Sequence, residues 1–293
     1  MVDIEKILQM EKLYVDENGI FVAKSEYSGE IAISKDAWKK LNDFSVETLT
    51  RQRKLFDKDK LKDHLFYIED SYNFDPNTIY LEIGCGPAHI GEYVMREHKS
   101  TFIGIDFDYN VLVTLKEYLE KKGYSNFALI HADINDMPIK DNSIDYIYGA
   151  GVIEHFPNTE HIIRESYRIL KKDGVTFNTV PALTLWWFLT FYNTIPNVPF
   201  FRSVVEFIHS KILHGNILRK NFGYQLCFSK SYLVKIHEKL GFIEVQSGVF
   251  AVNAFENKLS NKFLRGVYLW IQKFPLTASF YYVTGKKERP IRK

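Results

Sequence analysis

From Thr78 onward, short apolar runs alternate with amphipathic segments, and this alternation constrains the fold more than any other feature of the sequence. The segments TIYLEIG, TFIGID, NFALIHAD, SIDYIYGA and GVTFNTV have the length and apolar content of buried strands. Between them, HIGEYVMREH, YNVLVTLKEYLEKKG and residues 160–172 have helical periodicity. This order predicts a parallel sheet with helices on both faces, because right-handed crossovers place helices on each side. We therefore expect an α/β fold built on a doubly wound, Rossmann-like sheet.

The flanking segments differ in character, so we expect five parts. They are a mixed strand and helix extension (1–75), the core of the sheet (76–182), an aromatic insertion (183–228), the C-terminal part of the sheet with a basic amphipathic helix near 253–274 (229–285), and a basic tail (286–293). The uncharged run 183–201 contains Asn, Thr and Pro, which is unfavourable for a membrane span.

The charge is divided between two parts of the chain. Residues 1–182 carry 22 Lys+Arg and 31 Asp+Glu, a net of −9, whereas residues 183–293 carry 16 and 5, a net of +11. The basic part indicates an anionic partner, which could be a membrane surface, a nucleic acid or an acidic substrate. Two cysteines are too few for a disulfide framework, and the first residues lack the pattern of a secretion signal. A cytoplasmic location is expected.

The glycine turn after the first central strand is the sharpest chemical signal. Gly84 and Gly86 let the backbone approach a ligand closely, and Asp106 ends the next strand twenty residues later. Asp106 could bind both ribose hydroxyls, and Asp133, at the third strand end, could bind an adenine amino group. The loop GCGPAHIG lacks the third glycine of a nicotinamide-binding turn. Glu82 would repel a pyrophosphate but suits the ammonium and sulfonium of S-adenosylmethionine.

At LEIGCGPA, GIDFDYNVL, ADINDMPIKDNSIDYIYGAGVIEHF and RESYRILKKDGVTFNTVP, the sequence resembles the class I S-adenosylmethionine-dependent methyltransferases, in the group that acts on quinones, sterols and other small molecules. Ala88 departs from the pattern, in which a third glycine is usual. The resemblance implies a seven-stranded sheet whose last strand, ASFYYVTG, runs antiparallel. It implies cofactor contacts from Glu82, Gly84, Cys85, Gly86, Asp106, Phe107, Asp133, Ile134, Gly149 and Ala150. It also places Glu154 and His155 near the methyl-transfer face.

His155 is the candidate catalytic base, since neutral imidazole can accept a proton near pH 7. The alternative is that it only lines the pocket. The aromatic insertion is the candidate lid over the acceptor, with an additional layer of core as the alternative reading. The candidate acceptor contacts in it are Trp186, Trp187, Phe191, Tyr192 and Tyr224. The basic helix near 253–274 suits an anionic membrane interface or, alternatively, an ordinary surface position.

These features predict methyl transfer from S-adenosylmethionine to a hydrophobic or aromatic small molecule, such as a lipid or quinone-like acceptor. No metal is expected. Two alternatives are RNA or protein methylation and a non-catalytic subunit that binds S-adenosylmethionine. A nucleic acid partner is disfavoured because no recognisable RNA-binding module is present and GVIEHF stands where base methyltransferases carry an Asn-Pro-Pro-Tyr or Asp-Pro-Pro-Tyr motif.

Overall fold

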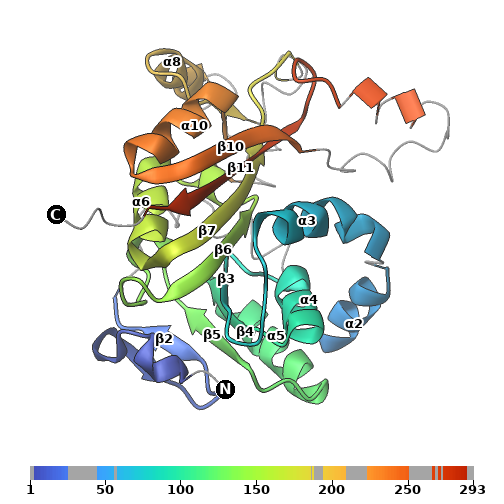
Figure 1. The fold of residues 1–293 in the computed structure, drawn as a ribbon, viewed down its shortest axis with the longest axis vertical. Coiled ribbons are helices and arrows are strands. Elements are labelled where there is room, and N and C mark those ends of the chain that lie inside the picture. The colour runs from blue at the N-terminus through green and yellow to red at the C-terminus, as the bar shows by residue number, and fades with distance from the viewer. Residues whose placement is uncertain are drawn as a thin grey trace.

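A twisted β-sheet forms the centre of the molecule (Figure 1). The computed structural model describes residues 3–25, 45–55, 58–185, 187, 194–208, 223–250, 266–267, 270–271 and 273–288. Within these residues, seven strands follow the order β5-β4-β3-β6-β7-β11-β10. They are β3 (Ile79–Ile83), β4 (Thr101–Asp106), β5 (Phe127–His131), β6 (Ile144–Ala150), β7 (Leu170–Pro181), β10 (Phe242–Phe250) and β11 (Phe280–Lys287). Strands β3 to β7 pair in parallel, and β11 is antiparallel to both β7 and β10. This confirms the predicted α/β sheet and its antiparallel last strand.

Two short N-terminal strands extend the sheet to nine strands in the described residues. Strand β1 (Leu13–Val15) pairs antiparallel with β2 (Phe21–Ala23), and β2 pairs in parallel with β5. The turn between β1 and β2 is closed by Asp16, whose carboxylate accepts hydrogen bonds from the backbone N–H of Asn18 and Ile20, both at 2.9 Å. The sequence predicted short strands here but gave no signal that they join the same sheet. The sheet therefore has two strands more than the seven that we expected from the sequence.

Helices cover both faces of the sheet (Figure 1). They are α2 (Val46–Leu55), α3 (Lys58–Ser71), α4 (His89–His98), α5 (Tyr109–Lys121), α6 (Thr159–Ile169), α8 (Phe201–Phe207) and α10 (Lys230–Lys239), with 3-10 turns η1 (Ile4–Lys6), η2 (Met10–Lys12), η3 (Ile134–Asp136) and η4 (Ile153–His155). Side chains of Asp108 and Ser229 cap α5 and α10. Helix α6 ends three residues before the predicted end, because Leu170 is already extended and begins β7.

The two faces of the sheet have different cores. Alternation along β3 sends Ile79, Leu81 and Ile83 to the face covered by α6 and α10, and Tyr80 to the face covered by α3 and α4. On that second face the tyrosines of β6 also bond to α3: Tyr146 shares a hydrogen bond of 3.0 Å with Ser71, and the hydroxyl of Tyr148 lies 2.6 Å from Nδ1 of His64. Buried hydroxyls therefore fix α3 in register on the sheet.

The aromatic insertion is described only in part. Strand β8 (Ile195–Pro196) pairs in parallel with β9 (Leu226–Cys227), and α8 follows β8. Trp186, Phe191 and Tyr192 lie outside the described residues, as do residues 26–44 of the N-terminal extension, most of the predicted basic helix near 253–274 and the end of the tail. None of the helices in the described ranges has both the length and the apolar character needed to cross a bilayer.

Candidate functional site

The predicted glycine turn lies between β3 and α4 and has the backbone that its sequence requires. Gly84 has φ 57°, and a Cβ at this position would approach Cγ2 of Val152 to 2.8 Å. Gly86 has φ 46°, but a Cβ there would meet nothing within 4 Å. Ala88 also lies in the left-handed region, at φ 49° and ψ 49°, which costs an L-residue about 1–2 kcal/mol. The space beside Gly86 is therefore open to a ligand at the carboxyl edge of the sheet.

Asp106 links the end of β4 to this turn. Its carboxylate accepts hydrogen bonds from the backbone N–H of Gly86 at 2.8 Å and of Asp108 at 2.9 Å. Burial raises the pKa of Asp106 to about 6, and these backbone hydrogen bonds oppose that rise. The carboxylate is therefore mostly ionised at neutral pH and is held beside the open side of Gly86.

The next strand end carries the second predicted acid. Asp133 follows β5 and accepts a hydrogen bond of 2.8 Å from the backbone N–H of Asn135, which caps η3. Ile134 is buried within η3. Phe107, after β4, is partly buried, and its carbonyl accepts a hydrogen bond of 3.0 Å from Nε2 of His131. Because β4 and β5 are neighbours, Asp106, Phe107, Asp133 and Ile134 come to one edge of the sheet.

Glu82 and Cys85 lie on the buried side of the turn. The Glu82 carboxylate accepts a hydrogen bond of 2.9 Å from the N–H of Gly91, in the first turn of α4, where the helix dipole favours negative charge. Burial raises the pKa of the Cys85 thiol well above its usual range. A Cβ at Gly104 would come within 2.9 Å of the Cys85 sulfur, so the thiol fills a tight space.

Gly149 and Ala150 end β6, on the other side of β3 from β4. A Cβ at Gly149 would lie 2.6 Å from Oδ1 of Asn178 and 2.9 Å from Ile83, so close packing against β3 and β7 excludes any side chain there. Ala150 is partly exposed. The predicted cofactor residues therefore end four adjacent strands, in the order β5, β4, β3 and β6.

His155 lies in η4, directly after β6. Its Nδ1 is 2.6 Å from the carbonyl oxygen of Tyr224, and because a carbonyl can only accept, Nδ1 carries the proton. Burial lowers the pKa of His155 to about 4, so the imidazole is neutral at physiological pH. Glu154 beside it is 1% exposed, and burial raises its pKa to about 8. A neutral histidine and a mostly protonated carboxyl therefore follow the glycine end of β6.

A network of side chains that the sequence did not predict joins α8 to this histidine. Arg202 donates a hydrogen bond of 2.7 Å to the hydroxyl of Tyr224, and that hydroxyl donates one of 2.6 Å to Glu206. Arg202 also pairs with Glu206 at 3.0 Å. The spacing of Arg202 and Glu206, four residues apart, was the only sequence signal for this contact. Tyr224 thus binds α8 through its hydroxyl and His155 through its carbonyl.

The other described aromatic residue predicted to meet the acceptor is Trp187. It is buried, its indole N–H donates a hydrogen bond of 3.2 Å to the carbonyl of Thr194, and its ring centroid lies 5.8 Å from that of Phe201 in an edge-to-face contact. Trp187 and Tyr224 therefore both support α8 and the segment before it. Their predicted contact with an acceptor stays a prediction.

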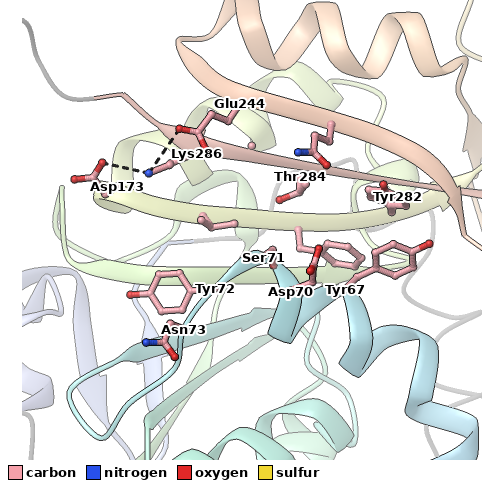
Figure 2. A pocket seen from close by; sticks show the side chains of 14 residues that line it. Tyr67, Asp70, Ser71, Tyr72, Asn73, Asp173, Glu244, Tyr282, Thr284 and Lys286 are labelled. Atoms are coloured by element: carbon pink, nitrogen blue, oxygen red, sulfur yellow. Dashed lines mark ion pairs between the residues drawn. The ribbon is translucent and has the colours of Figure 1, made fainter.

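A cavity of about 390 Å³ lies away from this site (Figure 2). It is bordered by the end of α3 and the facing parts of β7, β10 and β11, and Lys286 forms ion pairs of 3.7 Å with Asp173 and Glu244 across one side. Its β7 residues are Asp173, Val175 and Phe177, at least four residues before the carboxyl end of that strand at Pro181, whereas the glycine turn lies at the carboxyl ends of the strands. The cavity is therefore separate from the candidate cofactor site.

The residues at the carboxyl edge fit the ligand that the sequence indicated. A buried carboxylate at the end of β4, an open space beside Gly86 and a second acid after β5 suit a nucleoside with free ribose hydroxyls. Among the residues that the structure describes, no group of three His, Cys, Asp or Glu side chains could hold a metal ion.

Comparison with known proteins shows that the central part of the chain is similar to methyltransferases. Residues 81–177 match a protein-family model described as a methyltransferase domain. Over 99 residues the chain is 30% identical to the demethylmenaquinone methyltransferase of Listeria welshimeri, which is 33% of this chain and 42% of that protein. Over 113 residues it is 24% identical to the sterol 24-C-methyltransferase of Aspergillus fumigatus, which is 38% and 30% of the two chains. The chain thus spans less than half the length of these curated relatives.

Solved structures extend the similarity beyond the matched domain. Phosphoethanolamine N-methyltransferase 2 of Haemonchus contortus, solved with S-adenosyl-L-methionine, superposes with a TM-score of 0.57. The alignment covers 92% of this chain and 62% of that one, at 16% identity. At this identity the similarity concerns the fold, and it supports the arrangement of the sheet on either side of residues 81–177.

Proposed function

We propose that this protein transfers a methyl group from S-adenosylmethionine to a hydrophobic small molecule. Two findings support the proposal: residues 81–177 match a methyltransferase domain model, and the sheet is similar in fold to an S-adenosylmethionine-bound methyltransferase. The observation that carries the proposal is the pairing of Asp106 with the Gly86 turn. A mostly ionised, buried carboxylate is fixed by two backbone N–H groups beside an open space.

In this proposal each strand end contributes a different part of the cofactor site. Asp106 accepts hydrogen bonds from the ribose hydroxyls, while Phe107, Asp133 and Ile134 surround the adenine. Glu82 and the backbone at Gly84 and Gly86 border the methionine part, as do Gly149 and Ala150, and Cys85 fills the space behind the turn. When bound, the sulfonium supplies an electrophilic methyl group, so the protein has mainly to orient the acceptor and exclude water.

His155 has the chemistry to remove a proton from the acceptor. Its pKa of about 4 makes it a weak base that is neutral throughout the physiological range. The hydrogen bond from Nδ1 to Tyr224 leaves Nε2 as the basic nitrogen. Such a base suits an acceptor whose hydroxyl or carbon acid is itself fairly acidic. Methylation of oxygen or of an activated carbon fits this arrangement.

The acceptor class rests on the relatives and on the residues after β7. The two curated relatives are named for demethylmenaquinone and sterol methylation, and both names denote polycyclic or isoprenoid lipids. In this chain residues 183–228 are rich in aromatic side chains, which suit such an acceptor. The net charge of +11 over residues 183–293 favours an anionic membrane as the place where the acceptor is met. We therefore propose a cytoplasmic enzyme in peripheral contact with a membrane.

The test combines binding and turnover. Isothermal titration calorimetry should show stoichiometric binding of S-adenosylhomocysteine. Incubation with S-adenosylmethionine carrying a labelled methyl group should then label a demethylated quinol or a sterol in detergent, but not RNA or a protein extract. Absence of cofactor binding would refute the whole proposal. Cofactor binding with label in RNA or protein would refute the lipid acceptor alone, and binding with no label in any acceptor class would favour the non-catalytic alternative.

A further inference from the structure

Helix α8 exposes a row of large apolar side chains to solvent. Val204 and Phe207 are 41% and 59% exposed, and their spacing of three residues places them on one side of the helix, while Phe200, which directly precedes the helix, is 84% exposed. The opposite side is buried, since Val205 is 4% exposed and Arg202 bonds to Tyr224. Apolar side chains therefore lie on both sides of α8, whereas an ordinary surface helix keeps its apolar side toward the core.

Phe200 is held in an unfavourable backbone conformation while its ring faces solvent. Its φ of 63° is a genuine outlier for a bulky side chain. The residue therefore combines an unfavourable backbone conformation with the exposure of a large apolar ring. A binding partner that covers the ring would recover the burial of a Phe side chain.

Two other segments, linked to α8 through the Trp187–Phe201 contact, also expose large apolar side chains. Leu185 and Leu276 are 58% and 70% exposed, and the backbone N–H of Leu185 donates a hydrogen bond of 3.0 Å to the carbonyl of Leu276. Trp187, two residues from Leu185, contacts the ring of Phe201, which is 43% exposed. We call the combined surface the apolar end surface, made of Leu185, Phe200, Phe201, Val204, Phe207 and Leu276. It unites residues from three parts of the chain.

The apolar end surface lies on the acceptor side of the candidate site. Leu185 follows the carboxyl end of β7, and Leu276 precedes β11, whose first residue pairs with Pro181 at that end. Arg202 on the inner side of α8 contacts the hydroxyl of Tyr224, and the carbonyl of Tyr224 holds His155. A hydrophobic molecule that left a lipid phase through this surface would therefore emerge close to the candidate base.

The net positive charge of the C-terminal part of the chain indicates which partner fits the apolar end surface. Arg202 and Glu206 of α8 pair with each other, and residues 183–293 as a whole carry 16 Lys+Arg against 5 Asp+Glu. Apolar and aromatic side chains combined with an excess of Lys and Arg are typical of segments that lie in an anionic lipid interface. We propose that the apolar end surface inserts into the surface of an anionic lipid bilayer and opens the acceptor side of the site to lipid. The proposal rests on the proposed function, because it names the phase from which the acceptor enters.

Vesicle flotation tests this docking directly, without any need for turnover. The wild-type chain is mixed with vesicles of phosphatidylcholine containing one-third phosphatidylglycerol at low salt. The double variant Phe200→Asn/Val204→Asn replaces two outward side chains and should reduce the fraction bound at least about tenfold, since burial of a Phe side chain alone exceeds one decade in affinity. The matched control is Tyr14→Asn, because Tyr14 is 51% exposed on β1, which pairs with β2, and Figure 1 shows β2 at the other end of the molecule from α8. The control should float like the wild type.

The outcomes separate docking from catalysis. Equal flotation of the double variant and the wild type would refute the role of the apolar end surface, as would no flotation of the wild type. A wild-type dimer that dissociates in the double variant, without vesicle binding, would assign the surface to a second copy and also refute the proposal. Binding of S-adenosylhomocysteine is measured on every variant. If the double variant binds S-adenosylhomocysteine like the wild type but no longer floats with vesicles, the docking proposal is supported. If the wild type itself does not bind S-adenosylhomocysteine, that result contradicts the proposed function and leaves the flotation result to decide the docking proposal.

Discussion

The cofactor side and the acceptor side of the candidate site are built in different ways. On the cofactor side, Asp106 and Asp133 are held by backbone N–H groups of the turns in which the strands end. On the acceptor side, His155 is held by the carbonyl of Tyr224, 69 residues away in sequence, and Tyr224 is held by side chains of α8. The first side depends on local backbone geometry and the second on contacts between distant segments.

Substitutions on the two sides should therefore have different effects. Backbone N–H groups are present whatever side chains surround them, so Asp106 and Asp133 can keep these hydrogen bonds when neighbouring exposed side chains change. The acceptor side depends on particular side chains, because a change at Arg202, Glu206 or Tyr224 also changes what supports His155. We expect variants of the first group to alter cofactor affinity and variants of the second to alter turnover and acceptor binding.

Asp106→Ala should give the largest effect and should act on the cofactor side alone. In the proposed site the change removes the charged acceptor for two ribose hydroxyls, and it also removes the hydrogen bond to Gly86, so affinity for S-adenosylhomocysteine should fall at least about hundredfold. Calorimetry measures it. The control Asp136→Ala removes a neighbouring acid of η3 whose side chain is about half exposed, and it should leave affinity unchanged. An Asp106→Ala variant that binds within twofold of the wild type would contradict the assignment of the ribose site.

Glu154→Gln should change the pH dependence of stability. The folded pKa of about 8 lies above the unfolded value of about 4.5, so the native state holds a proton that the unfolded chain has released. Wild-type stability therefore declines as pH rises from about 4.5 to 8, by roughly 4 kcal/mol. The glutamine variant lacks this decline. Urea unfolding at pH 5 and pH 8 measures the difference, and parallel pH curves for the two proteins would show that Glu154 is ionised in the folded state.

His155→Ala should reduce turnover about hundredfold with cofactor affinity within twofold, because a positioned base acts on the reaction and not on the nucleoside. His155→Asn retains an N–H that can donate to the Tyr224 carbonyl but lacks a basic nitrogen. If the two variants lose activity equally, His155 acts as a base; recovery in the Asn variant would assign it an orienting role. Because the pKa of His155 is about 4, its protonation state does not change between pH 6 and pH 8. Wild-type turnover should therefore stay level over this range as far as His155 controls it.

Tyr224→Phe should give the smallest effect. It removes the hydroxyl between Arg202 and Glu206 but keeps the carbonyl that binds His155. We expect a loss of about 1–2 kcal/mol in unfolding free energy, which chemical denaturation measures, and a rise in the KM for the acceptor. Tyr109→Phe is the control, since its hydroxyl bonds to Asp16 at the N-terminal hairpin instead. An unchanged acceptor KM for Tyr224→Phe would show that the contacts between Tyr224 and α8 do not contribute to acceptor binding.

The sequence allowed prediction of the cofactor side because its features are local. Strand ends, glycines and the acids that follow them lie within a few residues of one another, and the parallel sheet brings neighbouring ends together. The Arg202–Tyr224 contact depends on how residues 183–228 fold back, which no short-range pattern encodes. The pairing of β2 with β5 was missed for a related reason, since a three-residue strand has too short an alternation to identify its partner.

The short β1 also affects how copies of this protein meet each other. In the described part of the chain, β1 and β10 are the outermost strands of the sheet. Strand β1 offers only three residues, and β10 is interrupted near Ile243 by a bulge at which Glu244 has φ 52°. A neighbouring chain thus finds no long, flat ladder on which to add a strand, and fibril-like association through the sheet edges is disfavoured.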